Sequence, residues 1–280
     1  MATLGNGKKT AEIIEKYRFS FQKKFGQNFL IDSNILEKIV DSAELTEQDC
    51  VLEIGPGIGT MTQYLAEQAR EVIAVEIDKN LIPILEETLG DYDNVTVINE
   101  DILKVDINRI VQERNGGRPI KVVANLPYYI TTPIIFRLFE EATKLESITI
   151  MVQKEVAERV CAKAGGKDYG ILTVMTNYYG TPKIARIIKR QMFFPEPNVD
   201  SALLVIKLDK NKFSEIDSKA FSRFVKACFS MRRKTMLNNL STIYPKDKLK
   251  EVLDEKTLSA RAEQFDLDGF IEIFKKLENV

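Results

Sequence analysis

The sequence contains no histidine among its 280 residues. That absence excludes a Ser-His-Asp triad, a Cys-His nucleophile pair, an H-E-x-x-H zinc site and an imidazole proton shuttle. Any catalysis must therefore use carboxylates, amides, hydroxyls, lysines, aromatic faces or a bound cofactor.

Cysteine is also scarce. Cys50, Cys161 and Cys228 lie far apart and form no C-x-x-C pair, so we expect neither a metal site nor a disulfide framework. This usage is typical of a reducing compartment. The chain has no apolar run long enough to cross a membrane, and residues 1–17 lack the apolar segment of a signal peptide. We therefore expect a soluble cytoplasmic protein with no membrane partner.

Length and apolar patterning predict two domains of different class. At roughly 150 residues per domain, the chain is long enough for about two. Between residues 51 and 152 short apolar runs alternate with stretches of helical periodicity, which is typical of βαβ units and a parallel sheet covered on both faces. After about residue 212 the periodicity is helical only. We predict an α/β catalytic domain over residues 1–210 and a small all-α domain over residues 211–280. The expected strands are 51–54, 72–75, 95–98, 121–124, 148–152 and 202–206, and the expected helices are 35–43, 61–69, 79–89 and 133–145.

The strongest local motif is the segment 51–60, in which a strand leads into a glycine-rich turn and then a helix. Glycine permits a sharp turn and the close approach of a ligand. The dinucleotide fingerprint G-x-G-x-x-G does not fit, because its last position is Thr60 and the third glycine is Gly59. Glu53, just before the turn, also adds negative charge where a dinucleotide phosphate would lie. Taken alone, the segment is equally typical of a tight βα turn.

Two acidic residues follow the next two expected strands. Glu76 lies 76 − 55 = 21 residues beyond Gly55, at a strand tip where a carboxylate accepts hydrogen bonds from a ribose diol. Asp101 follows the third strand and can accept a hydrogen bond from an adenine amino group. A pocket with adenosine contacts and carboxylates suits S-adenosylmethionine better than NAD. Either acid alone is more typical of a helix cap or a solvated strand end.

A candidate catalytic turn follows the fourth strand and consists of Asn125, Leu126, Pro127 and Tyr128. The lone pair of an adenine N6 is delocalised, and two acceptors holding its N–H groups would direct that lone pair at a methyl donor. The Asn125 oxygen and a backbone carbonyl of Leu126 or Pro127 can supply them, and Tyr128 offers a face for an extruded base. Catalysis then rests on positioning and electrostatics, which need no histidine. The alternative is a helix-start turn with its tyrosines in the core.

These motifs together resemble those of the ribosomal RNA adenine dimethyltransferase family, and most closely its bacterial KsgA-type branch. The resemblance implies a Rossmann-like class I S-adenosylmethionine-dependent methyltransferase fold with a reversed seventh strand. It implies a monomeric enzyme that acts on immature 30S subunits during ribosome biogenesis. The implied product is N6,N6-dimethyladenosine at two adjacent adenines in the 3′-terminal hairpin of 16S rRNA. The matching segments are 26–30, 53–59, 76–78, 100–101, 125–128, 194–201 and 232–234.

The resemblance also implies the functional side chains. Phe194 would stack on the target adenine together with Tyr128. The family usually has Phe-Pro-Pro-Pro at 194–197, whereas this chain has Glu196 at the third position, which adds a negative charge to a loop expected to face RNA. The residues expected to contact S-adenosylmethionine are Asn28, Leu30, Gly55, Gly57, Glu76, Ile77, Asp101, Ile102 and Asn125, and those expected at the reacting base are Asn125, Leu126, Pro127, Tyr128 and Phe194.

The charge balance of 40 Lys+Arg against 41 Asp+Glu, a formal net charge of −1, does not by itself suggest an RNA-binding protein. Phosphate contact needs only a local basic surface, however. We expect three clusters to form one such surface around the Asn125 pocket, although a solvated helix face explains each cluster alone. The clusters are Lys23 and Lys24 near the N-terminus, Lys189 and Arg190 at the end of a run that also holds Lys183 and Arg186, and Arg232, Arg233 and Lys234.

Two alternatives within the same fold remain at this point. One is the macrolide-resistance type of rRNA adenine methyltransferase, which acts on the large subunit and has Asn-Ile-Pro-Tyr where this chain has Leu126 at the second position. The other is a non-catalytic RNA-binding assembly factor, which the intact 125–128 turn and the carboxylates disfavour. An NAD-dependent oxidoreductase is disfavoured by Thr60.

Overall fold

The computed structural model describes residues 4–5, 7–17, 26–141, 144–209 and 212–278. It divides into two compact units: residues 1–157 with 183–208, and residues 158–182 with 209–280. This differs from the single boundary expected at 210, because the segment 158–182 packs with the C-terminal helices. Tyr178 in that segment stacks on Phe221, with ring centroids 4.6 Å apart.

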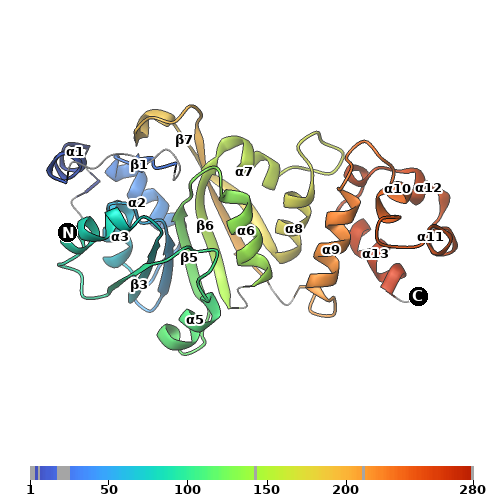
Figure 1. The fold of residues 1–280 in the computed structure, drawn as a ribbon, viewed down its shortest axis with the longest axis horizontal. Helices are drawn as coiled ribbons and strands as arrows, with labels where there is room; N and C mark the ends of the chain where they lie inside the picture. Colours follow the sequence, from blue (N-terminus) through green and yellow to red (C-terminus); the bar gives the residue numbers. More distant parts are fainter. Residues whose placement is uncertain (1–3, 6, 18–25, 142–143, 210–211, 279–280) are drawn as a thin grey trace. The chain divides into compact units, whose positions relative to one another are not determined.

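The first unit is built on a mixed seven-stranded sheet with the order β4-β3-β2-β5-β6-β9-β7 (Figure 1). The strands β4, β3, β2, β5 and β6 are parallel, and β9 runs antiparallel to β6. A separate two-stranded ribbon pairs β1 (Phe29–Leu30) with β8 (Phe193–Phe194). The strands of the large sheet are β2 (Cys50–Ile54), β3 (Glu71–Glu76), β4 (Val95–Asn99), β5 (Ile120–Asn125), β6 (Leu145–Gln153), β7 (Gly180–Ile188) and β9 (Ser201–Leu208).

The six predicted strands are all present, and the reason is their composition. All five residues of β2 are buried, and so are the first five residues of β5. Such continuous apolar runs suit strands that are covered on both faces. β7 was not predicted. It is the last strand at one edge of the sheet, and Lys183 and Arg186 are both exposed on it. This half of the basic run therefore lies on a strand and not on a helix face.

The helices of the first unit follow their capping signals. The side chain of Asp32 accepts a hydrogen bond from the Ile35 amide at 2.9 Å and starts α2, as predicted. The helices predicted over 61–69 and 133–145 end earlier, at Ala66 and Glu140. The residues that follow each helix form the connection to the next strand, β3 after the first helix and β6 after the second. The helical elements are α1 (Gly7–Lys16), α2 (Ser33–Ser42), α3 (Thr60–Ala66), η2 (Lys79–Leu81), α4 (Ile82–Thr88), α5 (Ile107–Asn115), α6 (Thr131–Glu140), α7 (Lys154–Val160) and η3 (Arg190–Met192). The last residues of α7 belong to the second unit, and η3 directly precedes β8.

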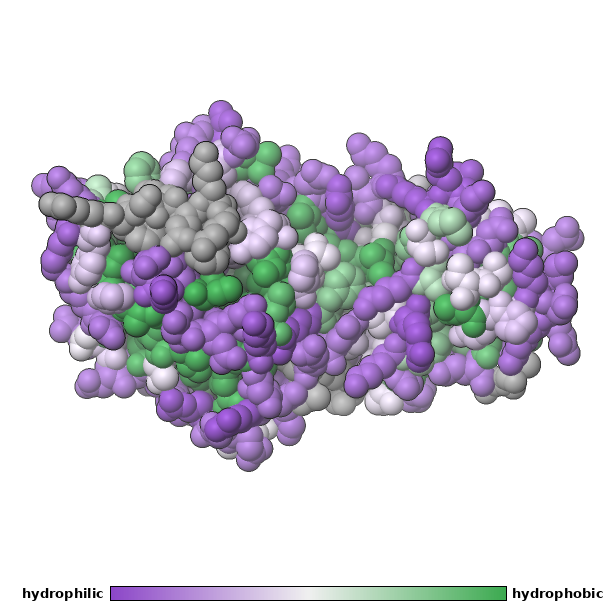
Figure 2. Space-filling model, viewed as in Figure 1, coloured by the Kyte–Doolittle hydropathy of each residue, from purple (hydrophilic) through white to green (hydrophobic). Residues whose placement is uncertain are grey.

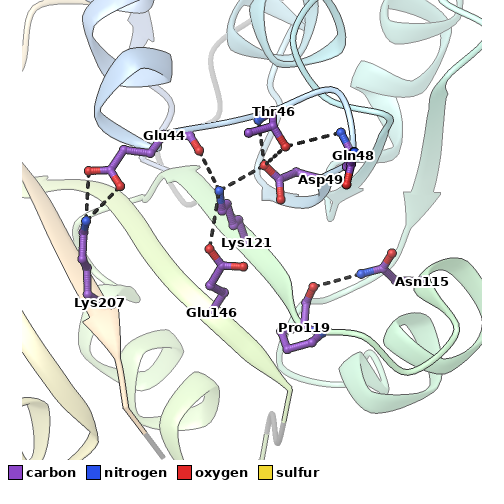
Figure 3. Close-up of polar contacts among 9 residues, drawn as sticks. All are labelled: Glu44, Thr46, Gln48, Asp49, Asn115, Pro119, Lys121, Glu146 and Lys207. Atoms are coloured by element: carbon purple, nitrogen blue, oxygen red, sulfur yellow. Dashed lines mark hydrogen bonds and ion pairs between the residues drawn. The ribbon is translucent and has the colours of Figure 1, made fainter.

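Ion pairs tie the amino ends of the parallel strands together (Figure 3). The buried Lys121 of β5 donates to the Glu44 carbonyl at 2.6 Å and to the Asp49 carboxylate at 3.0 Å. Its ammonium also lies 3.5 Å from Glu146 of β6. Nearby, the Glu44 carboxylate pairs with Lys207 of β9 at 2.8 Å. This edge lies at the opposite ends of the strands from Asn125, so its role is structural.

The second unit has no strand among its described residues after 209. Its core is a cluster of fully buried aromatic side chains, in which Phe274 lies 5.3 Å from both Phe221 and Phe224, measured between ring centroids. The all-helical character predicted for residues 211–280 therefore agrees with the described part. The helices are α8 (Ile171–Tyr179), α9 (Ser218–Cys228), α10 (Met236–Leu240), α11 (Lys246–Val252), α12 (Glu255–Ser259), the short η4 (Ala262–Gln264) and α13 (Leu267–Glu278).

The surface is mostly hydrophilic on the face drawn in Figure 2. This fits a chain whose apolar residues form two cores. Among the residues that the structure describes, none of the helices combines the length and the apolar character needed to cross a membrane.

Candidate active site

A pocket opens at the carboxyl ends of β2, β3, β4 and β5, where parallel α/β sheets bind their ligands. The segment 26–30 forms one wall. All nine residues expected to contact the cofactor line this pocket, and so do Leu126, Pro127 and Tyr128. The structure thus brings together residues from five separate stretches of the sequence.

The glycine-rich turn after β2 is shaped by three glycines with positive φ. Gly55, Gly57 and Gly59 have φ values of 71°, 64° and 87°. At Gly57 a Cβ atom would lie 2.7 Å from the Phe29 ring, which leaves no room for a side chain. A Cβ atom at Gly55 would have one neighbour within 4 Å, the Asn125 carbonyl oxygen at 4.0 Å. The backbone at Gly55 is therefore open toward the pocket and can approach a ligand closely.

Glu76 ends β3 as a buried carboxylate that holds the turn. One oxygen accepts from the Gly57 amide at 3.2 Å and the other from the Asp78 amide at 2.7 Å. Burial raises the pKa of Glu76 to about 7, although these backbone hydrogen bonds oppose the shift. Each carboxylate oxygen has a second lone pair. Glu76 can therefore hold its own loop and still accept a hydroxyl from a ligand.

Glu53 is the second-to-last residue of β2, just before the glycine-rich turn, and it is fully buried. Neither of its carboxylate oxygens meets a donor at hydrogen-bond geometry within the described part of the chain. Burial raises the pKa of Glu53 to about 8, the nearby Thr62 hydroxyl opposes the shift, and the Glu76 carboxylate adds to it. The side chain is therefore largely neutral at pH 7, which corrects the expectation that Glu53 puts a full negative charge beside the turn.

Asp101 lies in the turn after β4 and caps it, because its carboxylate accepts from the Leu103 amide at 2.9 Å. Asp101 therefore does serve as a local cap, and this hydrogen bond uses one of its two carboxylate oxygens. Ile102 is buried, Ile77 is 45% exposed, and both line the pocket together with Asp101. Two aliphatic side chains and a carboxylate in one pocket suit a purine ring with an amino group.

The orientation of Asn125 is set by a residue far away in the sequence. Its amide nitrogen donates to the backbone carbonyl of Asn28 at 2.9 Å. The Asn28 side chain in turn donates to the Gly26 carbonyl at 3.0 Å. With its nitrogen held in this way, Asn125 has its amide oxygen free to point elsewhere as an acceptor.

The carbonyls of Leu126 and Pro127 are not equivalent. The Pro127 carbonyl accepts from the Ile130 amide and from the Thr131 hydroxyl, both at 3.1 Å, and so closes the turn into α6. The Leu126 carbonyl accepts no hydrogen bond from the described residues, while the Leu126 amide donates to Met151 at 3.2 Å. Of the two candidates that the sequence left open, Leu126 has the available acceptor.

The two aromatic residues expected at the reacting base differ in their placement. The half-buried Tyr128 shares a hydrogen bond of 2.8 Å with the buried Ser201 hydroxyl at the start of β9, and burial raises the pKa of Tyr128. The structure does not place Phe194 in the lining of the pocket, but it pairs with Phe29 across the β1–β8 ribbon and is 46% exposed. The ribbon therefore connects Phe194 to the wall formed by 26–30.

The described residues among those expected to contact RNA belong to both units. Lys189 pairs with Asp200 and Arg190 with Glu196, each at 2.9 Å, so the unusual Glu196 neutralises one of the cations assigned to RNA. Lys23 and Lys24 lie outside the described residues. Arg232, Arg233 and Lys234 are exposed in the second unit. The single basic surface around the pocket stays a prediction.

Two pocket contacts had no role assigned from the sequence. The Gln27 amide donates to the buried Asp78 carboxylate at 2.9 Å and ties the 26–30 segment to the end of β3. Tyr129 lies at the pocket with 58% of its surface exposed. Gln27 lies within the motif 26–30 and Tyr129 directly follows the motif 125–128, and this position was the available signal.

A family model described as Ribosomal RNA adenine dimethylase matches residues 18–279. The chain belongs to this family. A Ribosomal RNA small subunit methyltransferase A from Lachnoclostridium phytofermentans is 54% identical to this rRNA adenine dimethylase, over 98% of this chain and 97% of its own length. The expected class of enzyme, an rRNA adenine dimethyltransferase, is thereby confirmed.

Solved structures agree on the fold of this rRNA adenine dimethylase. A dimethyladenosine transferase from Plasmodium falciparum superposes with a TM-score of 0.74 at 25% identity and covers 90% of this chain and 98% of its own. The 23S rRNA methyltransferase ErmE superposes with a TM-score of 0.64 at 29% identity and covers 90% of this chain and 100% of its own. The predicted class I methyltransferase fold, including the reversed strand β9, is confirmed, and the NAD-dependent alternative loses its support.

Proposed function

We propose that this enzyme binds S-adenosylmethionine in the pocket at the ends of β2–β5 and dimethylates N6 of two adjacent adenines in the 3′-terminal hairpin of small-subunit rRNA. The observation that carries the proposal is the pair of acceptors at Asn125 and Leu126. One amide oxygen and one carbonyl, neither of which has a donor among the residues that the structure describes, belong to side chains and backbone lining a carboxylate-rich pocket.

The residues of the pocket fit the proposed cofactor. S-Adenosylmethionine, when bound, supplies an electrophilic methyl group on a sulfonium centre. Glu76 would hold the ribose hydroxyls, and Asp101 with Ile77 and Ile102 would hold the adenine. The open backbone at Gly55 leaves room for the ligand, and the buried Glu53 carboxyl, whose oxygens have no donor at hydrogen-bond geometry among the described residues, offers an acceptor to a cationic group. Asn28, Leu30 and Gly57 complete the wall.

Catalysis by the chain is a matter of orienting the target amine. The two N6 hydrogens of the adenine would be donated to the Asn125 oxygen and the Leu126 carbonyl, which turns the nitrogen lone pair toward the methyl group. Tyr128, anchored through Ser201, would stack on the base together with Phe194. After transfer the protonated amine is acidic enough to lose its proton to water. Positioning of this kind is worth several kcal/mol and requires no general base.

Substrate binding is proposed to involve the basic residues. Lys23, Lys24, Lys189, Arg190, Arg232, Arg233 and Lys234 would contact phosphates of the immature 30S subunit. The Lachnoclostridium phytofermentans relative, which matches nearly the whole chain, is named a small subunit methyltransferase, and this supports the small subunit as substrate. We further propose that the enzyme works as a monomer in the cytoplasm.

The test is a methylation assay with labelled S-adenosylmethionine and undermethylated small subunits, followed by mapping of the modified bases. We expect two adjacent N6,N6-dimethyladenosines near the 3′ end of 16S rRNA. Asn125→Ala should lower the single-turnover rate by at least a hundredfold, because it removes an acceptor used at the reacting amine. Asn238→Ala, at an exposed amide on α10, is the matched control and should keep full activity. Label in large-subunit rRNA instead would favour the macrolide-resistance type.

A further inference from the structure

A buried amide on α10 holds the loop that carries Arg232, Arg233 and Lys234. Asn239 is only 1% exposed. Its oxygen accepts from the Met231 amide at 3.1 Å and from the Ser230 hydroxyl at 3.2 Å. Its nitrogen donates to the Cys228 carbonyl at 2.6 Å and to the Met231 carbonyl at 3.2 Å. All four hydrogen-bonding positions of the side chain are thus used on one loop.

Two of these hydrogen bonds are made to one residue, Met231. Asn239 pairs with both the N–H and the C=O of Met231, as a neighbouring strand would. The Met231 carbonyl also accepts from the Lys234 amide at 2.9 Å, which closes a turn over the basic residues. Since Cys228 is the last residue of α9, the same side chain holds the start of the loop and its middle. The backbone of the loop is therefore preformed.

The side chains presented by this loop suit a nucleic acid. Met231 is 44% exposed, and the three basic residues after it are exposed too. Within the described part of the chain, Arg233 and Lys234 make no ion pair, whereas Lys189 and Arg190 are each paired with an acid. Arg232 donates to the Lys167 carbonyl and is thereby held in place. Cations next to an apolar side chain match phosphates next to a sugar or base face.

We propose that Asn239 is a positioning residue for RNA recognition, which holds the loop 229–234 in the conformation that contacts rRNA. The proposal rests on the proposed function, in that it takes rRNA to be the partner. Its physical basis is entropy: ordering a mobile loop on binding costs conformational entropy, and a preformed loop avoids that cost. Asn239 is not among the residues that line the cofactor pocket.

The experiment compares Asn239→Ser with Asn238→Ser, the same substitution at the exposed neighbouring position. Binding to undermethylated small subunits is measured between 50 and 200 mM salt at constant Mg²⁺. We expect Asn239→Ser to weaken binding on the order of tenfold and to lower the salt slope by about two, because two phosphate contacts lose their geometry. The affinity for S-adenosylmethionine and the single-turnover rate at saturating subunits should not change, and Asn238→Ser should match the wild type.

A double-mutant cycle separates positioning from mere stability. Arg233→Ala should weaken binding in the wild type and have little further effect in Asn239→Ser. Additive effects, or an unchanged salt slope in a folded Asn239→Ser protein, would overturn the proposal.

Hydrogen exchange of the wild type tests the preformed loop even if the variant does not fold. The Met231 amide should exchange slowly and the Arg233 amide quickly, and fast exchange at Met231 would also overturn the proposal. If the wild type itself does not bind or methylate small subunits, the proposed function fails. If the wild type is active and Asn239→Ser behaves like it, only this inference fails.

Discussion

At the scale of single residues, the active site depends on groups whose hydrogen-bonding state differs from that in water. Asn125 has its nitrogen committed to Asn28, so its oxygen remains for a ligand. Glu76 has both oxygens on backbone amides. Glu53 is the exception, because it is fully buried and meets no donor in the described part of the molecule. Such a group costs free energy when it ionises, and that cost is measurable as pH dependence.

Glu53→Gln should flatten the pH dependence of stability. The pKa of Glu53 is about 8 in the folded protein, against about 4.3 in an unfolded chain. Between these values the unfolded state binds fewer protons, so the free energy of unfolding falls as the pH rises. Urea unfolding at pH 6 and pH 8 should show the wild type losing about 2 kcal/mol more than Glu53→Gln.

The matched control for this change is Glu100→Gln, at an exposed carboxyl that lines the same pocket. It should retain the pH dependence of the wild type. Equal slopes for the wild type and Glu53→Gln would show that Glu53 is ionised at pH 8 without cost and would contradict the assigned protonation state.

At the scale of elements, the two ends of the sheet have different tasks. The carboxyl ends of β2–β5 form the pocket and carry glycines with positive φ and the buried Glu53 carboxyl. The amino ends are tied by Lys121, which reaches Glu44, Asp49 and Glu146 (Figure 3). Of the charged groups at the amino ends, the Lys121 side chain is buried, Asp49 is partly buried and Glu146 is exposed, and they hold that end of the strands while the other end forms the polar, open site.

Lys121→Ala should destabilise the first unit by about 2 kcal/mol, because it leaves the Asp49 carboxylate and the Glu44 carbonyl without their donor. The value is below that for a fully buried pair, since Asp49 also accepts from the Thr46 amide and hydroxyl. Urea denaturation followed by circular dichroism measures it. Lys207→Ala, in the exposed pair drawn in the same figure, is the matched control and should change stability little. Equal effects of the two substitutions would mean that Lys121 is not a structural tie.

At the scale of the whole molecule, the near-zero net charge conceals an uneven distribution. The formal charge is −1, yet the loop 229–234 presents cations that no described acid pairs with. Counterion release depends on local phosphate contacts and not on net charge. RNA affinity should therefore respond to where a charge is changed and not to how many are changed.

The double charge reversal Arg232→Glu and Arg233→Glu should weaken binding to small subunits and lower the salt slope by about two. Arg109→Glu with Arg114→Glu, on α5 in the first unit, changes the net charge by the same amount and is the control. Filter binding over a salt series measures both. A comparable loss in the control would show that total charge, not the loop, governs RNA binding.

Much of this protein follows from local patterns in the chain. The apolar runs predicted six strands of the sheet, and the spacing of Gly55, Gly57 and Gly59 disfavoured a dinucleotide. The order of Glu53, Glu76, Asp101 and Asn125 after successive strands predicted one pocket, since carboxyl ends of parallel strands meet at one edge. These inferences succeed because strand periodicity and glycine conformation depend on residues close together in sequence.

The tertiary structure decided what depends on distant contacts. The Asn125 amide takes its direction from Asn28, 97 positions away, and the choice of the Leu126 carbonyl over that of Pro127 follows from how α6 begins. The neutral state of Glu53 comes from burial on a central strand. The segment 158–182 joined the second unit because Tyr178 packs against aromatic rings beyond residue 209. Each outcome reflects packing or desolvation by neighbours that no local pattern brings together.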